Sequence, residues 1–179
     1  SLSEVYFTDL NFKEVKTDLQ INLLEHTSTI LDFGLEQEAV RPIKEIQDSG
    51  LDPLTSFFAI FRSLKEDEFC MLQVLFKGVQ HSWSRELLNA VSDGRGGSFF
   101  SEAPDMPKLS QIKTSSPLYG VVLRLAIQGL SKERTAHIAE DAIYHIKSIS
   151  QSGTNQLIPL SNEGYEFSNH YYNLKHRTS

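Results

Sequence analysis

The sequence has little cysteine and no long apolar run. Its 179 residues include one cysteine, Cys70, so no intramolecular disulfide can form, which is typical of a reducing compartment. No apolar stretch approaches the roughly 18 residues that span a bilayer, and no basic-then-apolar leader is present. We therefore expect a soluble, cytoplasmic chain.

The sequence is also short of positive charge. It has 17 basic and 23 acidic residues, which gives a net charge of -6. Surfaces that grip nucleic acid concentrate Lys and Arg, because their affinity comes from neutralising phosphates. The charge balance therefore favours a protein partner or a homo-oligomer over direct contact with DNA.

Complete catalytic motifs are missing as well. The glycine-rich stretch Asp93–Ser98 matches neither GxGxxG nor GxxxxGK[ST], and Phe99-Phe100 follows it, so it indicates a flexible linker. No GxSxG or HExxH motif raises any serine or histidine above the others. We expect no catalytic residue, no bound cofactor and no enzyme activity in this chain.

Two weaker chemical candidates have simpler explanations. His137, Asp141 and His145 recur at four-residue steps on one helical face, as metal ligands can. His137 and Asp141 project opposite the isoleucine stripe of that helix, where an amphipathic helix places solvated residues, so we expect no metal site. Cys70 lies within the apolar run Phe69–Leu72 and is expected to be a buried, unreactive thiol.

The residues that are present predict alternating strands and helices. Strands are indicated at Val5-Tyr6-Phe7, at 19–24, at 69–77 and at 118–128; the last two are strongly apolar. Helices are indicated after Asp52-Pro53, at 84–91 and after the capping residue Ser131. The 98–117 segment, with three prolines, is expected to be a loop, Gly34 a turn, and the aromatic tail one more strand.

This order predicts an α+β fold, a ferredoxin-like (split βαβ) sheet with helices packed on one face. Residues 1–35 would form an N-terminal arm with strands and 36–153 the core, with a long loop near 93–117. Residues 154–179 would be an aromatic tail leading toward a downstream domain. The Ser1 start and the Arg177–Ser179 end suggest a fragment of a longer protein.

The tail carries the one candidate binding site. It mixes aromatic and basic side chains, as single-strand nucleic-acid binders do. The residues concerned are Tyr171, Tyr172, Lys175 and Arg177.

One further pattern of strand and helix signatures runs through the segments Glu38–Ile43, Asp52–Leu54, Leu64–Glu68, Met71–Phe76, Ser115–Tyr119, Ser131–Arg134 and His170–Arg177. In this pattern residues 36–179 resemble the region ahead of the motor in TraG-type and HerA/FtsK-like ATPases. The family drives conjugative DNA transfer, a form of type IV secretion, in bacteria. The resemblance implies an accessory domain of a ring-forming DNA pump, and it implies that this parent protein would bring the chain to the inner face of a membrane. No Walker A lysine or Walker B strand is present, so no ATPase residue can be assigned.

The sequence thus predicts a non-catalytic assembly or docking domain of such an ATPase. Two alternatives remain open at this point. One is a small free-standing enzyme with its site in the 94–117 loop. The other is a nucleic-acid-binding module that uses the C-terminal aromatic and basic residues.

Overall fold

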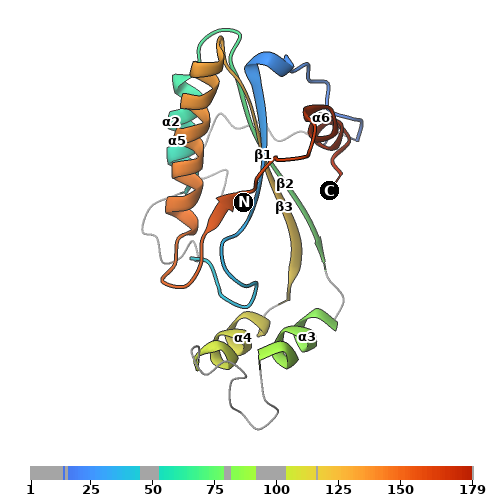
Figure 1. Cartoon of the computed structure of the whole chain (residues 1–179), viewed down its shortest axis with the longest axis vertical. Helices are drawn as coiled ribbons and strands as arrows, with labels where there is room; N and C mark the ends of the chain where they lie inside the picture. The colour runs from blue at the N-terminus through green and yellow to red at the C-terminus, as the bar shows by residue number, and fades with distance from the viewer. Residues whose placement is uncertain are drawn as a thin grey trace.

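A computed structural model describes residues 14, 16–44, 53–78, 82–91, 104–115 and 117–178. Its centre is an antiparallel sheet of four strands, β1 (Ser28–Leu35), β2 (Phe69–Gly78), β3 (Tyr119–Gln128) and β4 (Leu157–Pro159). The strand order is β2-β3-β1-β4, so β3 and β1 lie in the middle (Figure 1). The α+β class expected from the sequence is confirmed. The finer ferredoxin-like assignment stays a prediction.

Two crossover helices cover one face of the sheet. Helix α2 (Pro53–Ser63) joins β1 to β2, and α5 (Lys132–Ser150) joins β3 to β4; they lie side by side (Figure 1). Apolar side chains at helical spacing on both helices meet alternating side chains of the strands. The buried set is Phe33, Phe57, Ile60, Leu125, Ile127, Ile138, Ala139, Ala142 and Ile146.

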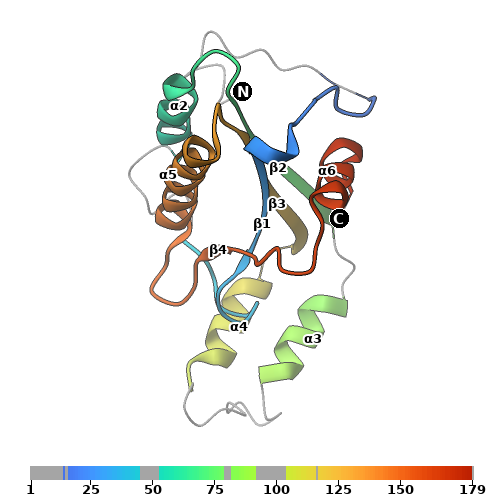
Figure 2. The same ribbon diagram turned by 45° about the horizontal axis from the view of Figure 1, so that its top comes forward.

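Helix α6 (Phe167–His176) covers part of the opposite face (Figure 2). Its Leu174 packs with Ile30 of β1 and Ala126 of β3, which point away from α2 and α5. The expectation that helices pack on one face is therefore wrong for α6. The C-terminal tail does contain one more strand, β4, but it does not finish in it: Tyr171 and Tyr172 lie in helix α6.

Helices α3 (Ser82–Val91) and α4 (Met106–Thr114) connect β2 to β3 and lie beyond the end of these strands (Figure 1). They share a small apolar cluster formed by Val40, Val91 and Met106. Lys113 of α4 also donates a hydrogen bond to the Ala39 carbonyl oxygen. Helix α4 lies within the 98–117 segment expected to be a loop; residues 92–103 and 116 lie outside the described residues.

The N-terminal part differs most from expectation. Residues 19–24 form no strand; they run along α6, where Leu19 N–H donates to the Lys175 carbonyl oxygen and Leu23 is buried. The sheet instead takes Ser28–Leu35, so Gly34 is part of a strand and not a turn. The Val5–Phe7 prediction lies outside the described residues.

The predicted start of α5 is confirmed. Ser131 accepts a hydrogen bond from the Arg134 N–H through its side chain, as an N-cap does. The turn before it depends on Gly129, where a Cβ atom would lie 2.7 Å from the Thr135 nitrogen. Thr135 in turn donates through its hydroxyl to the Thr27 carbonyl oxygen, which ties this turn to the start of β1.

Candidate interaction surface

Strands β2 and β3 form a continuous ribbon that extends past its helical cover. They pair antiparallel over their whole length, from Phe69 opposite Gln128 to Gly78 opposite Tyr119. At the first end α2, α5 and α6 pack on the ribbon. Toward Gly78 the burial decreases, and within the described chain α3 and α4 lie past the strand ends and leave the ribbon faces open (Figure 1).

Four apolar side chains share one face of the open half. They are Val74 and Phe76 of β2 with Tyr119 and Val121 of β3, each more than half exposed. Phe76 lies directly opposite Val121, and its ring meets Tyr119 edge-to-face with 6.3 Å between centroids. This ribbon patch continues the face that carries Leu123 and Leu125 into the core. Contiguous exposed apolar side chains of this kind are typical of interaction sites.

The two edge strands of the sheet, β4 and β2, differ in length and in proline content. Strand β4 is a short edge of three residues that ends in Pro159, and proline and short length both discourage further pairing. Strand β2 is an edge of ten residues without proline. Among the described residues, no backbone hydrogen bond reaches β2 from its outer side.

The covered half contains a buried charged cluster beneath α6. Arg124 of β3 is 1% exposed and forms a two-point ion pair with Asp32 of β1, at 2.7 and 3.2 Å. It also donates to Gln73 of β2 at 3.2 Å and to the Thr178 carbonyl oxygen at 3.1 Å. Gln73 donates to the Leu174 carbonyl oxygen. The cluster therefore satisfies carbonyl groups at the C-terminal end of α6 and fixes that helix on the sheet.

His170 of α6 lies beside this cluster. It is buried, its Nδ1 is 4.0 Å from an Asp32 carboxylate oxygen, and neither ring nitrogen has a hydrogen-bond partner. Burial is the largest effect on His170 and lowers its pKa; the Asp32 carboxylate raises the pKa by less than burial lowers it, and the positive charge of Arg124 lowers it further. A neutral imidazole therefore fits this position.

The four tail residues proposed as a nucleic-acid site lie on or at the end of α6. Tyr171 donates its hydroxyl to the Ile21 carbonyl oxygen, and Arg177 donates to that of Thr17. Both side chains thus hold the N-terminal segment. Tyr172 is exposed and its ring lies 4.2 Å from that of His176, and the backbone carbonyl of Lys175 accepts from Leu19. The nucleic-acid role stays a prediction.

The other sequence candidates have structural partners. Burial raises the pKa of Cys70 to about 11, which keeps the thiol protonated at neutral pH. His137 pairs with Asp141 at 3.3 Å, while the His145 ring packs edge-on against Phe57. Among the described residues, no group of three or more potential ligands is placed to hold a metal ion. In that same part of the chain, no helix has the length and apolarity to cross a membrane.

The three acidic residues at positions 66–68 differ in burial and pairing. Glu68 forms a two-point ion pair with Arg134 of α5, at 2.9 and 3.0 Å, and its side chain is fully covered. Hydrogen bonds from Arg134 lower the pKa of Glu68 to about 2. Glu66 and Asp67 remain exposed at the start of β2.

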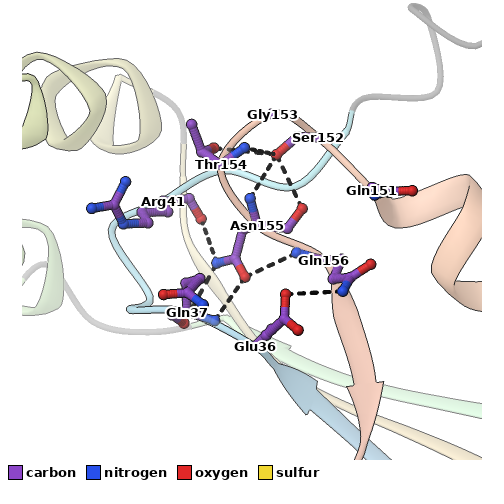
Figure 3. Close-up of a pocket in the computed structure, with 9 residues that line it drawn as sticks. All are labelled: Glu36, Gln37, Arg41, Gln151, Ser152, Gly153, Thr154, Asn155 and Gln156. Carbon is purple, nitrogen blue, oxygen red and sulfur yellow. Dashed lines mark hydrogen bonds between the residues drawn. The ribbon is translucent and has the colours of Figure 1, made fainter.

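A polar pocket of about 400 Å³ lies where the loop after α5 meets the segment after β1 (Figure 3). Its central side chain, Asn155, accepts from the Gln37 and Gln156 N–H groups and donates to the Arg41 carbonyl oxygen. Ser152 donates to the Pro42 carbonyl oxygen. These hydrogen bonds join the two loops, so the polar groups of the pocket already have a structural role.

Comparison with known proteins adds no assignment to this geometry. No protein-family model matches the chain, and no match was found among curated proteins or among solved structures. The ribbon patch is accordingly the feature on which a functional proposal rests. Sequence reasoning missed it, because its four residues continue the same alternation that buries Leu123 and Leu125.

Proposed function

We propose that this chain is a non-catalytic assembly or docking domain whose contact surface is the open half of the β2–β3 ribbon. The observation that carries the proposal is the ribbon patch of Val74, Phe76, Tyr119 and Val121, which leaves four large apolar side chains in water on one face. Covering such a surface with a partner is favourable, because association removes apolar area from water.

The parent of this domain is proposed to be a ring-forming DNA-translocating ATPase of conjugative-transfer type. The sequence resemblance over residues 36–179 supports this part. The net charge of -6 agrees with contacts to protein rather than to DNA. In this assignment the chemistry belongs to a motor, and the present chain supplies a contact between protein surfaces.

Site-specific photo-crosslinking in the full-length parent protein tests the proposal. A photoreactive phenylalanine analogue at Phe76 should give a crosslinked product whose peptides mass spectrometry identifies as protein of the same assembly. Tyr144, on α5, is the matched control, since it is an aromatic residue of nearly equal exposure, 77% against 73%. Equal crosslinking from both positions, or none from Phe76, would contradict a docking role for the ribbon.

The gene supplies a separate test of the parent. A strand followed by GxxxxGK[ST] within about a hundred codons downstream of Ser179 would agree with the motor assignment, since that motif cradles nucleotide phosphates. A reading frame that continues without such a motif would contradict the motor assignment. It would not affect the proposed docking role of the ribbon.

A further inference from the structure

We infer that the ribbon contacts a second copy of this chain, through antiparallel pairing of the two β2 edges about a two-fold axis. The inference deepens the proposed docking function and rests on it. Each copy would contribute the same strand, so the two four-stranded sheets would become one continuous sheet of eight. Unpaired N–H and C=O groups along an edge strand are a ready template for such pairing.

The two edges of the sheet restrict the ways in which copies can associate. Strand β4 has three residues and carries Pro159, whereas β2 has ten residues and no proline. Head-to-tail addition of β4 to β2 is therefore disfavoured, and β2 is left to pair with β2. A contact that uses the same surface on both copies closes as a dimer and does not extend into a filament.

The charges at the two ends of β2 are complementary in this arrangement. Lys77 is the only charged residue of the strand, and it lies exposed near its end. Glu66 and Asp67 lie exposed just before the strand begins. Antiparallel pairing about an axis near residues 72–74 brings Lys77 of each copy toward the acidic turn of the other. A parallel arrangement would place like charges together.

The covered and open halves also complement each other. The two-fold axis is normal to the sheet, so the face that carries α2 and α5 is the same face in both copies. The open half of one β2 then lies beside the half of the other that α2 covers. With the axis at Gln73, Phe76 of one copy comes opposite Cys70 of the second copy, a residue packed against the main core. The exposed apolar surface of each copy thus gains an apolar neighbour.

The area of this contact indicates how strong the dimer is. A ten-residue strand is about 33 Å long, and an edge about 10 Å deep therefore presents roughly 330 Å² per copy. Stable complexes bury about 800 Å² per partner. The edge alone falls short, and the ribbon patch and α2 of the second copy must supply the rest. We expect a dimer that forms reversibly with concentration. Its two-fold symmetry makes it a contact separate from the head-to-tail contacts that close a ring.

Sedimentation velocity over a concentration series tests the inference on the full 1–179 chain. The wild-type chain should change from monomer to dimer as concentration rises. Phe76→Ser should remove the dimer, whereas Tyr144→Ser, at an equally exposed aromatic on α5, should leave it unchanged. Circular dichroism melting of both variants verifies that each keeps its fold, which is expected because both side chains are largely exposed.

Charge exchange tests the antiparallel geometry. Lys77→Glu should weaken the dimer roughly three- to tenfold, because a modest surface attraction becomes a repulsion. Adding Glu66→Lys in the same chain should recover most of the loss. Glu66 is used because Asp67 has a φ of 68°, where a longer side chain adds backbone strain of its own.

Crosslinking distinguishes edge pairing from other dimers. Cysteine in place of Val74 lies within about 13 Å of its counterpart for an axis at residues 72–74, so a bis-maleimide of that span should join the copies. Cysteine in place of Tyr119, one strand further in, is about 30 Å or more from its counterpart and should not react across the dimer. The wild-type chain, whose Cys70 is partly buried, is the blank.

The outcomes separate this inference from the proposed function. A chain that stays monomeric at every concentration, or a dimer that Phe76→Ser leaves intact, overturns the pairing of copies. So does crosslinking at position 119 without crosslinking at 74. If Phe76 in the parent protein crosslinks to a different subunit of the assembly, the docking function stands and the second copy is excluded as the occupant. If neither experiment finds a contact at Phe76, both fail.

Discussion

The two halves of the β2–β3 ribbon share one register and one alternation but differ in what covers them. In the first half Leu125 and Ile127 are fully buried under α2 and α5, and Arg124 is buried under α6. In the second half Phe76 and Val121 point to the same face as Leu125 and remain in water. The two strands therefore pair along the whole ribbon, whether or not helices cover them. Burial of their side chains depends on α2, α5 and α6, which cover only the first half.

This difference assigns separate tasks to the two halves. The covered half holds the fold, because apolar burial and the charged cluster join β1, β2, β3 and α6 there. The open half adds little to folding and is available for association. Substitutions in the first half should change stability, and substitutions in the second should change association.

The largest effect is expected for Arg124→Met in the covered half. The substitution removes the guanidinium that pairs with the Asp32 carboxylate and donates to the Gln73 side-chain oxygen, and the loss of one member of a buried ion pair costs about 3–5 kcal/mol. Because Asp32 is a quarter exposed, the lower end of that range is expected. Urea unfolding followed by circular dichroism measures the change.

The double variant Asp32→Leu with Arg124→Met is the control. Replacing both charges with apolar groups removes the unpaired carboxylate, so much of the stability should return. An Arg124→Met protein as stable as wild type would mean that the cluster does not hold α6 to the sheet.

A comparison within β3 isolates burial from strand pairing. Leu125→Ala leaves a cavity in the main core and should lower the free energy of unfolding by about 2–4 kcal/mol. Val121→Ala, four residues earlier on the same face, should change it by no more than about 0.5 kcal/mol. Thermal unfolding of the two variants gives the comparison, and similar losses at both positions would show that the open half is covered in solution.

Sequence periodicity and capping residues were enough to predict the two helices and the two strands that form the covered half. Helices α2 and α5 have apolar stripes at helical spacing, and Pro53 and Ser131 mark their starts. Strands β2 and β3 are long apolar runs, and their observed bounds differ from the prediction by one residue at one end. Local pattern decides such elements, because each contains its own signal.

The missed elements depend on contacts distant in sequence. Strand β1 contains Asp32 and Gly34, which weaken a strand pattern, and Asp32 is satisfied by Arg124, 92 residues away. Residues 19–24 alternate like a strand, yet they run along α6 near the other end of the chain. The ribbon patch could not be predicted either. Its exposure depends on how far α2 and α5 extend over β2 and β3, and the sequences of the two strands carry no signal for that.

Acid should weaken the covered half through two groups in separate pH windows. The pKa of His170 lies below its usual 6.5 in the folded chain, so stability is full above pH 6.5 and falls as pH drops below it. The pKa of Glu68 falls from 4.5 to about 2, so the stability that it contributes is lost as pH drops from 4.5 toward 2. In the part of the chain that the structure describes, Asp32 and Arg124 are the charged groups that act on the pKa of His170, and the His170 ring packs against that of Tyr165.

Chemical denaturation at pH 7.5, 5.5 and 3.5 measures both windows. His170→Phe keeps an aromatic ring against Tyr165 and should flatten the change between pH 7.5 and 5.5. Glu68→Gln should lower stability at neutral pH and flatten the change below 4.5. If His170→Phe shows the same acid response as wild type, protonation of His170 is not what weakens the attachment of α6.

The smallest effect is expected at Gly78, at the tip of the open half. A Cβ atom at this glycine would contact nothing within 4 Å, so Gly78→Ala should stabilise the fold by about 0.4–1 kcal/mol through the unfolded state. Gly129→Ala is the opposing control, since its Cβ would lie 2.7 Å from the Thr135 nitrogen and should destabilise. Calorimetric melting resolves both signs. Gly78 lies opposite Tyr119, so the added methyl group falls beside the ribbon patch and should leave association intact. A variant that folds more stably and yet loses its dimer would mean that the second copy approaches the backbone at Gly78 too closely for a side chain.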